Sequence, residues 1–197
     1  MTATAKASLR QQVRARLSAI SHEQREAASL QICSRLRQQA IWKSAGSILL
    51  FAPLPSEPDI WRLLEEALLA GKTVALPRFS SQTQSYIACV VQNPQTDLRS
   101  GQFRIREPGL SCPEFPLNRL DLVLVPGVAF QSDGCRLGRG KGYYDRLLAA
   151  VRGTKCGVAF DEQIVGAIPV GPLDIRVNCI VTPTRWVEVA GDTRQVT

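Results

Sequence analysis

The sequence has very little of several features on which many protein functions depend. Its 197 residues include a single histidine, His22, and the cysteines form no Cys-x-x-Cys pair. A histidine-rich zinc site and a serine hydrolase triad are therefore nearly excluded. His22 follows Ser21 at the start of an expected helix, so we predict a surface position for it. No apolar run approaches the roughly 20 residues that a membrane-spanning helix needs, and we expect no membrane partner.

Aromatic residues are also scarce, at 6% of the chain, and they do not alternate with basic residues. Proteins that bind single-stranded nucleic acid use such an alternation, so no nucleic-acid partner is expected. The net charge of +7 and the isoelectric point near 9.4 suit a site for a polyanionic small molecule. The same charge also permits a module that binds nucleic acid or a phosphate polymer, and this alternative stays open.

The chain does contain enough apolar sequence to build a core. Hydrophobic residues make up 45% of it, and its length predicts a single domain over residues 1–197. Most of the cysteines lie in apolar runs, which indicates reduced thiols that act as small hydrophobic residues in a cytoplasmic protein. The six cysteines are Cys33, Cys89, Cys112, Cys135, Cys156 and Cys179.

The first 22 residues contain no acidic residue and four basic ones. This composition resembles a mitochondrial transit peptide, but an apolar residue at every fourth position from Leu9 to Leu17 predicts an amphipathic helix equally well. Lys6, Arg10 and Arg14 also follow a helical spacing. Lys6 falls on the apolar sector, with Arg10 at its edge, so these cations either bind an anion near the protein body or extend along the helix edge toward water.

Apolar strands alternate with helices along the chain, which predicts an α/β fold with a mostly parallel central sheet and helices on both faces. We expect a Rossmann-like three-layer architecture with ligands at the carboxyl ends of the strands. Residues 92–119 give no clear prediction. The expected strands cover residues 47–53, 73–77, 86–91, 120–126, 156–160 and 178–182, and the expected helices cover residues 6–19, 21–39, 59–69 and 143–151.

The most informative segment is the glycine-rich loop of residues 127–142. It reads GVAFQSDGCRLGRGKG and lies between an apolar strand and a helix start. Glycines let backbone N–H groups approach a ligand closely, and a helix N-terminus favours anions. The loop predicts a phosphate site, but it matches neither of two common nucleotide-binding motifs, the Walker A pattern and GxGxxG. A mobile surface loop is the alternative.

Three acidic residues lie where such a ligand would bind, and each has two interpretations. Asp145 in the first turn of the last helix is either a favourable partner of the helix dipole or a Mg²⁺ ligand. Glu57 follows the first strand and either faces the ligand or begins a helix. Asp174, between two expected elements, is equally ambiguous.

Together these segments resemble the 5-formyltetrahydrofolate cyclo-ligase family, in the same order and over nearly the whole chain. The run RLGRGKGYYD at residues 136–145 is highly specific to that family. The other matching positions are Lys6, Leu9, Arg10, Ser56, Glu57 and the segment around Asp174.

The resemblance implies an enzyme that uses ATP to convert 5-formyltetrahydrofolate, in mono- or polyglutamylated form, into 5,10-methenyltetrahydrofolate, with release of ADP and phosphate. The formyl oxygen is expected to attack the γ-phosphate, and N10 then closes on the activated carbon of the imino phosphate. Phosphoryl transfer needs positioning and charge neutralisation more than a protein nucleophile. That requirement agrees with a chain that has one histidine and a cationic loop. We also expect a monomer.

The resemblance also implies a role for each matching position. Lys141, Arg139 and Tyr143 are the expected catalytic residues, and Asp145 and Asp174 are the expected Mg²⁺ ligands. The expected ATP contacts are Lys6, Arg10, Arg136, Leu137, Gly138, Arg139, Gly140, Lys141, Gly142, Tyr143 and Tyr144. The expected folate contacts are Arg10, Ala52, Glu57 at the pterin ring, Arg139, Gly140, Lys141, Gly142 and Tyr143.

The sequence differs from the common family pattern at two places. Pro58 follows Glu57 where Val or Ile is common, and Asn178 replaces a common aspartate. Because proline fixes φ and removes an N–H donor, the wall of the pocket is a candidate for change. These differences leave open an enzyme of another class on the same fold, such as a sugar-phosphate isomerase or a transferase.

Overall fold

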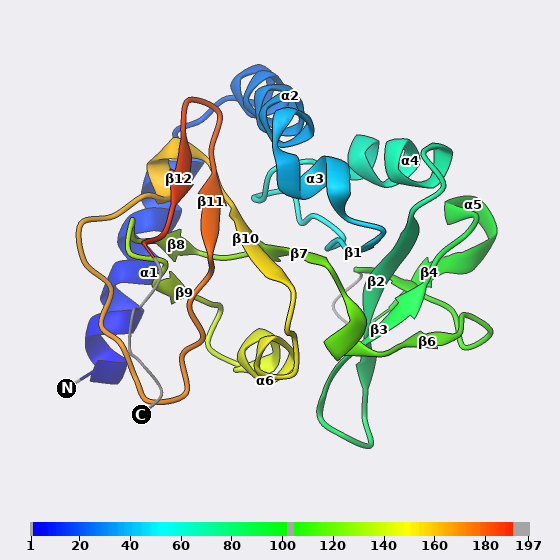
Figure 1. Cartoon of the computed structure of the whole chain (residues 1–197). Helices are drawn as coiled ribbons and strands as arrows, with labels where there is room; N and C mark the ends of the chain where they lie inside the picture. The colour runs from blue at the N-terminus through cyan, green and yellow to red at the C-terminus, as the bar shows by residue number, and fades with distance from the viewer. Residues whose placement is uncertain (1, 102–104, 191–197) are drawn as a thin grey trace.

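The computed structural model describes residues 2–101 and 105–190. Their centre is an eight-stranded mixed sheet in the order β12-β11-β10-β7-β1-β2-β3-β6 (Figure 1). The five inner strands β11, β10, β7, β1 and β2 pair in parallel, whereas β12, β3 and β6 pair antiparallel. The α/β fold with a mostly parallel sheet is thus confirmed. The strands are β1 (Ser47–Leu49), β2 (Thr73–Ser80), β3 (Ser85–Val90), β6 (Glu114–Phe115), β7 (Leu122–Pro126), β10 (Thr154–Val158), β11 (Cys179–Val181) and β12 (Trp186–Glu188).

The sheet separates two hydrophobic clusters, because successive side chains of a strand point to opposite faces. In β7, Leu122 and Leu124 join one cluster, and Val123 and Val125 join the other. The first cluster is covered by helices α1 (Thr2–Ser18), α2 (His22–Gln38), α3 (Ala40–Ser44) and α4 (Trp61–Leu69). Helix α6 (Tyr143–Ala149) covers the second cluster, on the opposite side of the sheet in Figure 1.

Local signals place the helix starts well. Ser21 caps α2 through a capping box, in which the Gln24 N–H donates to Ser21 Oγ at 3.2 Å and the Ser21 N–H donates to Gln24 Oε1 at 2.8 Å. His22 is exposed, as predicted. Helix α4 begins two residues later than expected, after the Asp59 carboxylate accepts the Trp61 N–H.

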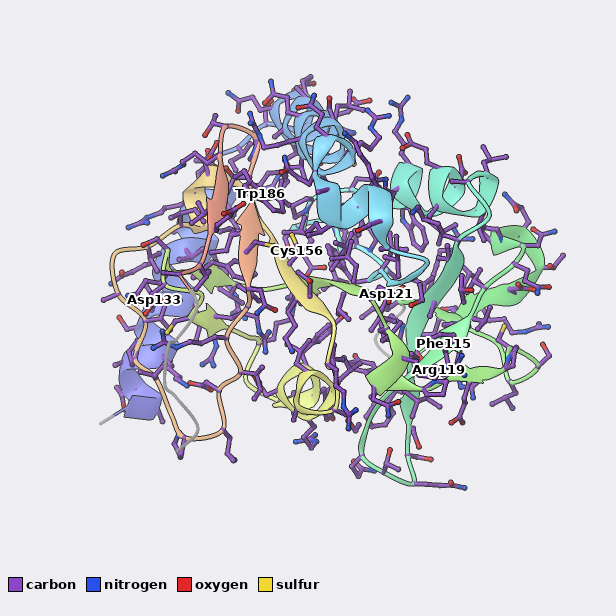
Figure 2. All side chains as sticks on the ribbon, in the orientation of Figure 1. Phe115, Arg119, Asp121, Asp133, Cys156 and Trp186 are labelled. Atoms are coloured by element: carbon purple, nitrogen blue, oxygen red, sulfur yellow. The ribbon has the colours of Figure 1, made fainter. Side chains whose placement is uncertain are left out.

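Buried cysteines pack within the core, and Asp121 joins two strands at the amino edge of the sheet. All six cysteines are buried free thiols, and Figure 2 shows Cys156 within the sheet. At the amino edge, Asp121 ties β7 to β1 because its Oδ2 accepts hydrogen bonds from Ser47 Oγ and from the Gly46 and Ser47 N–H groups. These bonds hold the pKa of Asp121 below its usual value.

The chain path differs from the sequence-based prediction at three places. The strand expected at residues 47–53 ends at Leu49, and the residues that follow leave the sheet ahead of Pro53 and Pro55, which cannot donate to a ladder. The glycine-rich loop, within which no strand was expected, contains a small hairpin of β8 (Ala129–Phe130) and β9 (Arg136–Leu137). Strand β12 was not expected at all.

The sequence made no prediction for residues 92–119, and their described parts, residues 92–101 and 105–119, form short elements. These are α5 (Pro94–Asp97), β4 (Leu98–Ser100), β5 (Arg106–Pro108), β6 and the 3-10 turn η2 (Leu117–Arg119), of which β4 and β5 form a separate antiparallel pair. A second 3-10 turn, η3 (Asp161–Gln163), follows β10. Among the described residues, no helix is long and apolar enough to cross a membrane.

Candidate active site

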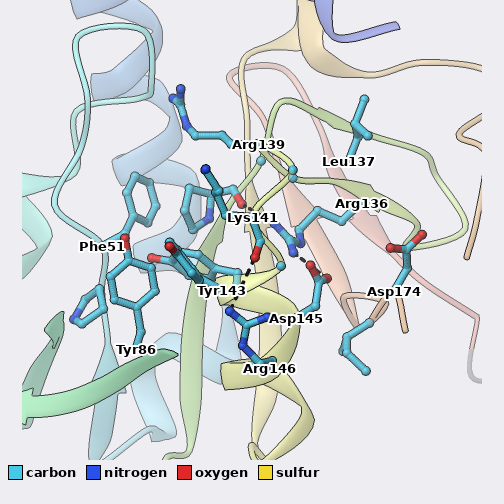
Figure 3. Close-up of a pocket in the computed structure, with 18 of the residues that line it drawn as sticks. Phe51, Tyr86, Arg136, Leu137, Arg139, Lys141, Tyr143, Asp145, Arg146 and Asp174 are labelled. Atoms are coloured by element: carbon cyan, nitrogen blue, oxygen red, sulfur yellow. Dashed lines mark hydrogen bonds and ion pairs between the residues drawn. The ribbon is translucent and has the colours of Figure 1, made fainter. Parts of the chain in front are cut away.

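A cavity of about 880 Å³ opens at the carboxyl edge of the parallel strands (Figure 3). Phe51 and Ala52 reach it from the segment after β1, and Pro126 and Gly127 reach it from the end of β7. The cavity therefore lies at the carboxyl ends of the strands, where the sequence predicts that a ligand would bind. The buried Gln163 of η3 holds the start of the loop, because its Nε2 donates to the Gly127 carbonyl at 2.7 Å.

The glycine-rich loop curves over this cavity through glycines that adopt left-handed backbone angles. Gly140 has φ of +102° and Gly142, just before α6, has φ of +66°, conformations that a side chain would strain. Helix α1 supports the loop from the side, where Arg10 Nε donates to the Gly138 carbonyl at 2.9 Å. This bond joins residues 128 positions apart and makes α1 a wall of the cavity.

Three ion pairs cross the cavity wall. Lys6 Nζ lies 2.5 Å from Asp174 Oδ2, Arg136 Nη2 lies 2.7 Å from Asp145 Oδ1, and Arg139 Nη2 lies 2.8 Å from Glu57 Oε1. The Arg136 side chain is only 3% exposed, and its guanidinium lies 5.8 Å from the centre of the Tyr144 ring. The pairs link α1 to the segment before β11, the hairpin to α6, and the loop to the segment after β1.

The first pair sets the charge of Asp174. Partial burial works against ionisation, but the Lys6 ammonium and the Gly171 N–H, 2.7 Å from Oδ2, hold the pKa of Asp174 below its usual value. Asp174 is therefore an anion at neutral pH, with a cation already beside it.

Asp145 and Asp174 form no ready-made metal cage. No cluster of three or more potential metal-ligating side chains exists within residues 2–101 and 105–190. Each of the two carboxylates has one oxygen bound to a cation and a second oxygen that accepts no hydrogen bond from any described residue. This donor set fits Mg²⁺ only as an ion shared with phosphate oxygens and water, which is its usual mode of binding in proteins.

An aromatic cluster forms the wall on the side of β2 and β3. The Tyr143 ring lies 5.1 Å from Phe79 and 5.6 Å from Tyr86, and Tyr86 also contacts Tyr144 at 5.6 Å, all between ring centres. Burial raises the pKa of the Tyr144 phenol well above its usual value and raises that of Tyr86. Both phenols are therefore neutral, and the cluster offers flat apolar faces to a ligand.

Among the residues that the structure describes, six basic side chains line the cavity, and they divide into two groups. Lys6, Arg136 and Arg139 are neutralised by the ion pairs above. Arg10, Lys141 and Arg146 have no carboxylate partner among the residues that the structure describes. The cavity therefore has an excess of positive charge, which an anionic ligand would balance.

The structure brings every sequence-predicted site residue to this one cavity, from Lys6 and Arg10 through Ala52 and Glu57 to Asp174. Arg14 is exposed and lies outside it. Pro58 and Asn178 also lie outside the lining. Asn178 instead exchanges two hydrogen bonds of 2.8 Å with the Lys155 backbone, so the departures at these two positions do not alter the cavity directly.

Sequence reasoning missed several lining residues, notably Phe51, Tyr86 and Arg146. Phe51 and Tyr86 read as ordinary apolar strand residues. Arg146 lies one residue beyond the RLGRGKGYYD run, and its spacing of three from Tyr143 on a helix was the signal that could have placed it on the same face.

The fold and the site define a class of α/β protein with a cationic cavity at the carboxyl edge of a mostly parallel sheet. Comparison with known proteins narrows this class. Residues 2–183 match the sequence model of the 5-formyltetrahydrofolate cyclo-ligase family, and the chain belongs to that family. It is therefore an enzyme, a ligase of folate one-carbon metabolism.

Individual relatives agree with this assignment. The 5-formyltetrahydrofolate cyclo-ligase of Escherichia coli (strain K12) is 33% identical over 88% of this chain and 97% of its own length. The Mus musculus enzyme of that name is 30% identical over 89% of this chain and 92% of its own length. The solution structure of Aquifex aeolicus 5,10-methenyltetrahydrofolate synthetase superposes with a TM-score of 0.85, at 33% identity, over 98% of this chain and 96% of that one.

Proposed function

We propose that this enzyme joins N10 of 5-formyltetrahydrofolate to the formyl carbon, at the expense of ATP, within the single cavity at the carboxyl edge of the sheet. The observation that carries the proposal is the convergence of two different walls. One wall, the glycine-rich loop with α1, supplies Arg10 and Lys141, which have no carboxylate partner among the described residues. The other wall supplies aromatic rings and the buried Glu57 carboxylate. A cavity with both walls suits a phosphate chain and a flat heterocycle side by side.

The nucleotide is assigned to the side formed by the loop and α1. Arg10 is fixed to the loop through the Gly138 carbonyl, and the Lys141 ammonium has no partner among the described residues. Gly138, Gly140 and Gly142 have no side chain between the loop backbone and the nearby guanidinium groups, which belong to Arg136, Arg10 and Arg146 respectively. Leu137 is buried at the end of β9 and fixes the start of this segment.

The folate ring is assigned to the side of Glu57 and the tyrosines. The Glu57 side chain is 7% exposed, and its Oε2 accepts the Leu54 N–H at 3.0 Å, so its position is fixed before a ligand arrives. The pterin presents two adjacent donors, the ring N3–H and the 2-amino group, that match a carboxylate. Binding of the pterin to Glu57 would replace Arg139, whose exposed guanidinium is then available to the phosphate.

The reaction needs these residues mainly for position and charge. The formyl oxygen attacks the γ-phosphorus, and the bond from that phosphorus to the bridging oxygen of ADP breaks. N10 then attacks the formyl carbon, N10 loses its proton, and the carbon–oxygen bond breaks as phosphate departs with the formyl oxygen. Lys141 and Arg139 neutralise the charge that gathers on the transferring group. The Tyr143 ring holds the folate so that the formyl oxygen faces the phosphate.

Asp145 and Asp174 are the residues proposed to hold Mg²⁺. The ion would supply charge neutralisation to the phosphate oxygens. Before the nucleotide binds, Arg136 would position Asp145 and Lys6 would position Asp174. The cytoplasmic location and the monomeric state are also proposals.

One assay tests the reaction. Purified protein with ATP, Mg²⁺ and 5-formyltetrahydrofolate should produce the absorbance of the methenyl product, with one ADP formed per product. The same mixture without ATP should stay colourless. A purified, folded protein that gives no methenyl product under these conditions would refute the proposed reaction.

Glu57→Gln is expected to raise the KM for 5-formyltetrahydrofolate by roughly 10- to 100-fold, because a charged acceptor for the pterin donors becomes a neutral one. The KM for ATP should change by less than about threefold. Steady-state kinetics with each substrate varied in turn measures both values. Glu65→Gln, on the surface of α4, is the matched control. An equal rise in both KM values would contradict the assignment of Glu57 to the folate side.

A further inference from the structure

Arg146 is the lining cation that the proposed chemistry does not use. It lies on α6, one turn after Tyr143, and its guanidinium carbon lies 5.2 Å from the centre of the Tyr143 ring (Figure 3). Its Nη2 donates to the Gln84 carbonyl at 2.7 Å and lies 3.5 Å from the Lys141 carbonyl. These contacts fix the guanidinium at the rim of the cavity, between α6 and the β2–β3 turn.

The charge of Arg146 is left unbalanced there. No carboxylate within residues 2–101 and 105–190 forms an ion pair with it, and its Nε and Nη1 have no hydrogen-bond acceptor among those residues. Arg136 and Arg139, the other two arginines of this segment, both have acidic partners. An arginine held by two carbonyls with an open edge of its guanidinium is suited to a carboxylate, which such an edge binds through two parallel hydrogen bonds.

The position of Arg146 relative to the proposed ligands selects the kind of anion. Arg146 belongs to the aromatic side of the cavity, with Tyr143 and Tyr86, whereas Asp174 lies on the opposite side of Arg136 in Figure 3. The phosphate chain is assigned to the loop and α1. Arg146 borders that loop at the Lys141 carbonyl, 3.5 Å from its Nη2, while its guanidinium lies over the Tyr143 ring. On the aromatic side, the anionic part of 5-formyltetrahydrofolate is the glutamate that ends its p-aminobenzoyl arm.

We propose that Arg146 binds a carboxylate of this glutamate and so determines how strongly the enzyme prefers folates with a glutamate tail. The inference rests on the proposed function, because it assigns the folate ring to the Tyr143 side of the same cavity. Lys141, the neighbouring cation without a carboxylate partner, stays with the phosphate.

The test compares Arg146→Gln with wild type on two substrates, 5-formyltetrahydrofolate and the N-methylamide of 5-formyltetrahydropteroate, which keeps the p-aminobenzoyl amide but has no glutamate and no carboxylate. On the first, the variant should raise KM about tenfold, the loss of one charged hydrogen-bonding pair, with kcat within about twofold of wild type. On the second, the variant and wild type should have the same KM. Arg152→Gln, an exposed arginine just beyond α6 and outside the cavity, should match wild type on both.

Two results would overturn the proposal. If Arg146→Gln raises KM by the same factor on both substrates, Arg146 acts by supporting Tyr143 and not by binding the tail. If it changes neither KM, the tail does not contact Arg146. Wild-type turnover of 5-formyltetrahydrofolate is measured in the same experiment, so failure of the proposed reaction is seen separately, as absence of product in every sample.

Discussion

Lys141→Ala should lower kcat by roughly 100- to 1000-fold, the range seen when one preorganised donor to a developing negative charge is removed. Lys141 lies between Gly140 and Gly142, both with left-handed backbone angles, so the loop presents its ammonium without help from a neighbouring side chain. Because the described residues offer it no carboxylate, the ammonium has full charge for the transferring phosphate. Steady-state kinetics with the methenyl absorbance gives the rate.

The stability of Lys141→Ala should stay within about 0.5 kcal/mol of wild type, because the mutated side chain is exposed and makes no ion pair. Lys43→Ala, on the exposed end of α3, is the control for the loss of a surface lysine and should keep wild-type kcat. A Lys141→Ala enzyme with wild-type kcat would show that the loop does not neutralise the reacting phosphate.

Arg136→Met should lower the free energy of unfolding by about 3 kcal/mol and abolish measurable turnover. Removal of one partner from a buried ion pair leaves the other charge without compensation, and the Arg136 side chain is 3% exposed against 21% for Asp145. The substitution also removes the link from the β8–β9 hairpin to α6 and to the Pro126 carbonyl, 3.3 Å from Nη1. Urea denaturation followed by circular dichroism measures the stability change.

The double variant Arg136→Met with Asp145→Asn separates the two effects of Arg136. Without the aspartate charge, much of the lost stability should return, because the buried pair is then removed as a whole. Turnover should stay absent, because the double variant lacks the Arg136 guanidinium and also the Asp145 carboxylate, which is one of the two proposed to hold Mg²⁺. A single Arg136→Met variant as stable as wild type would mean that the Arg136–Asp145 pair contributes no stability to the fold.

The sequence was most informative where function constrains many neighbouring residues. The run from Arg136 to Asp145 predicted the loop, the following helix and the family, and the comparisons confirm the family. The parallel strands were also predictable, because buried strands are continuous apolar runs with typical lengths. Short edge elements such as β12 and β6, with three and two residues, have no period long enough to recognise.

The ion pairs between distant residues could not be predicted from the sequence, for a different reason. Lys6 and Asp174 are 168 positions apart, and no local pattern relates them. The same holds for Arg139 and Glu57, whose contact depends on the exact path of the loop over the end of β1. The sequence could therefore place cations and carboxylates at one edge of the sheet, but not show that three of the six cations were already paired. Arg146 could be recognised as a candidate ligand-binding residue only after the structure showed which of the lining cations have carboxylate partners.

In the proposed reaction, the formyl oxygen itself attacks the γ-phosphate inside this cavity. The direct measurement uses wild-type enzyme, unlabelled ATP and water, and 5-formyltetrahydrofolate with ¹⁸O in the formyl group, followed by mass spectrometry of the released phosphate. We expect one ¹⁸O atom in phosphate for each methenyl product formed. Methenyl product accompanied by unlabelled phosphate would contradict it, because the formyl oxygen would then have left by another route.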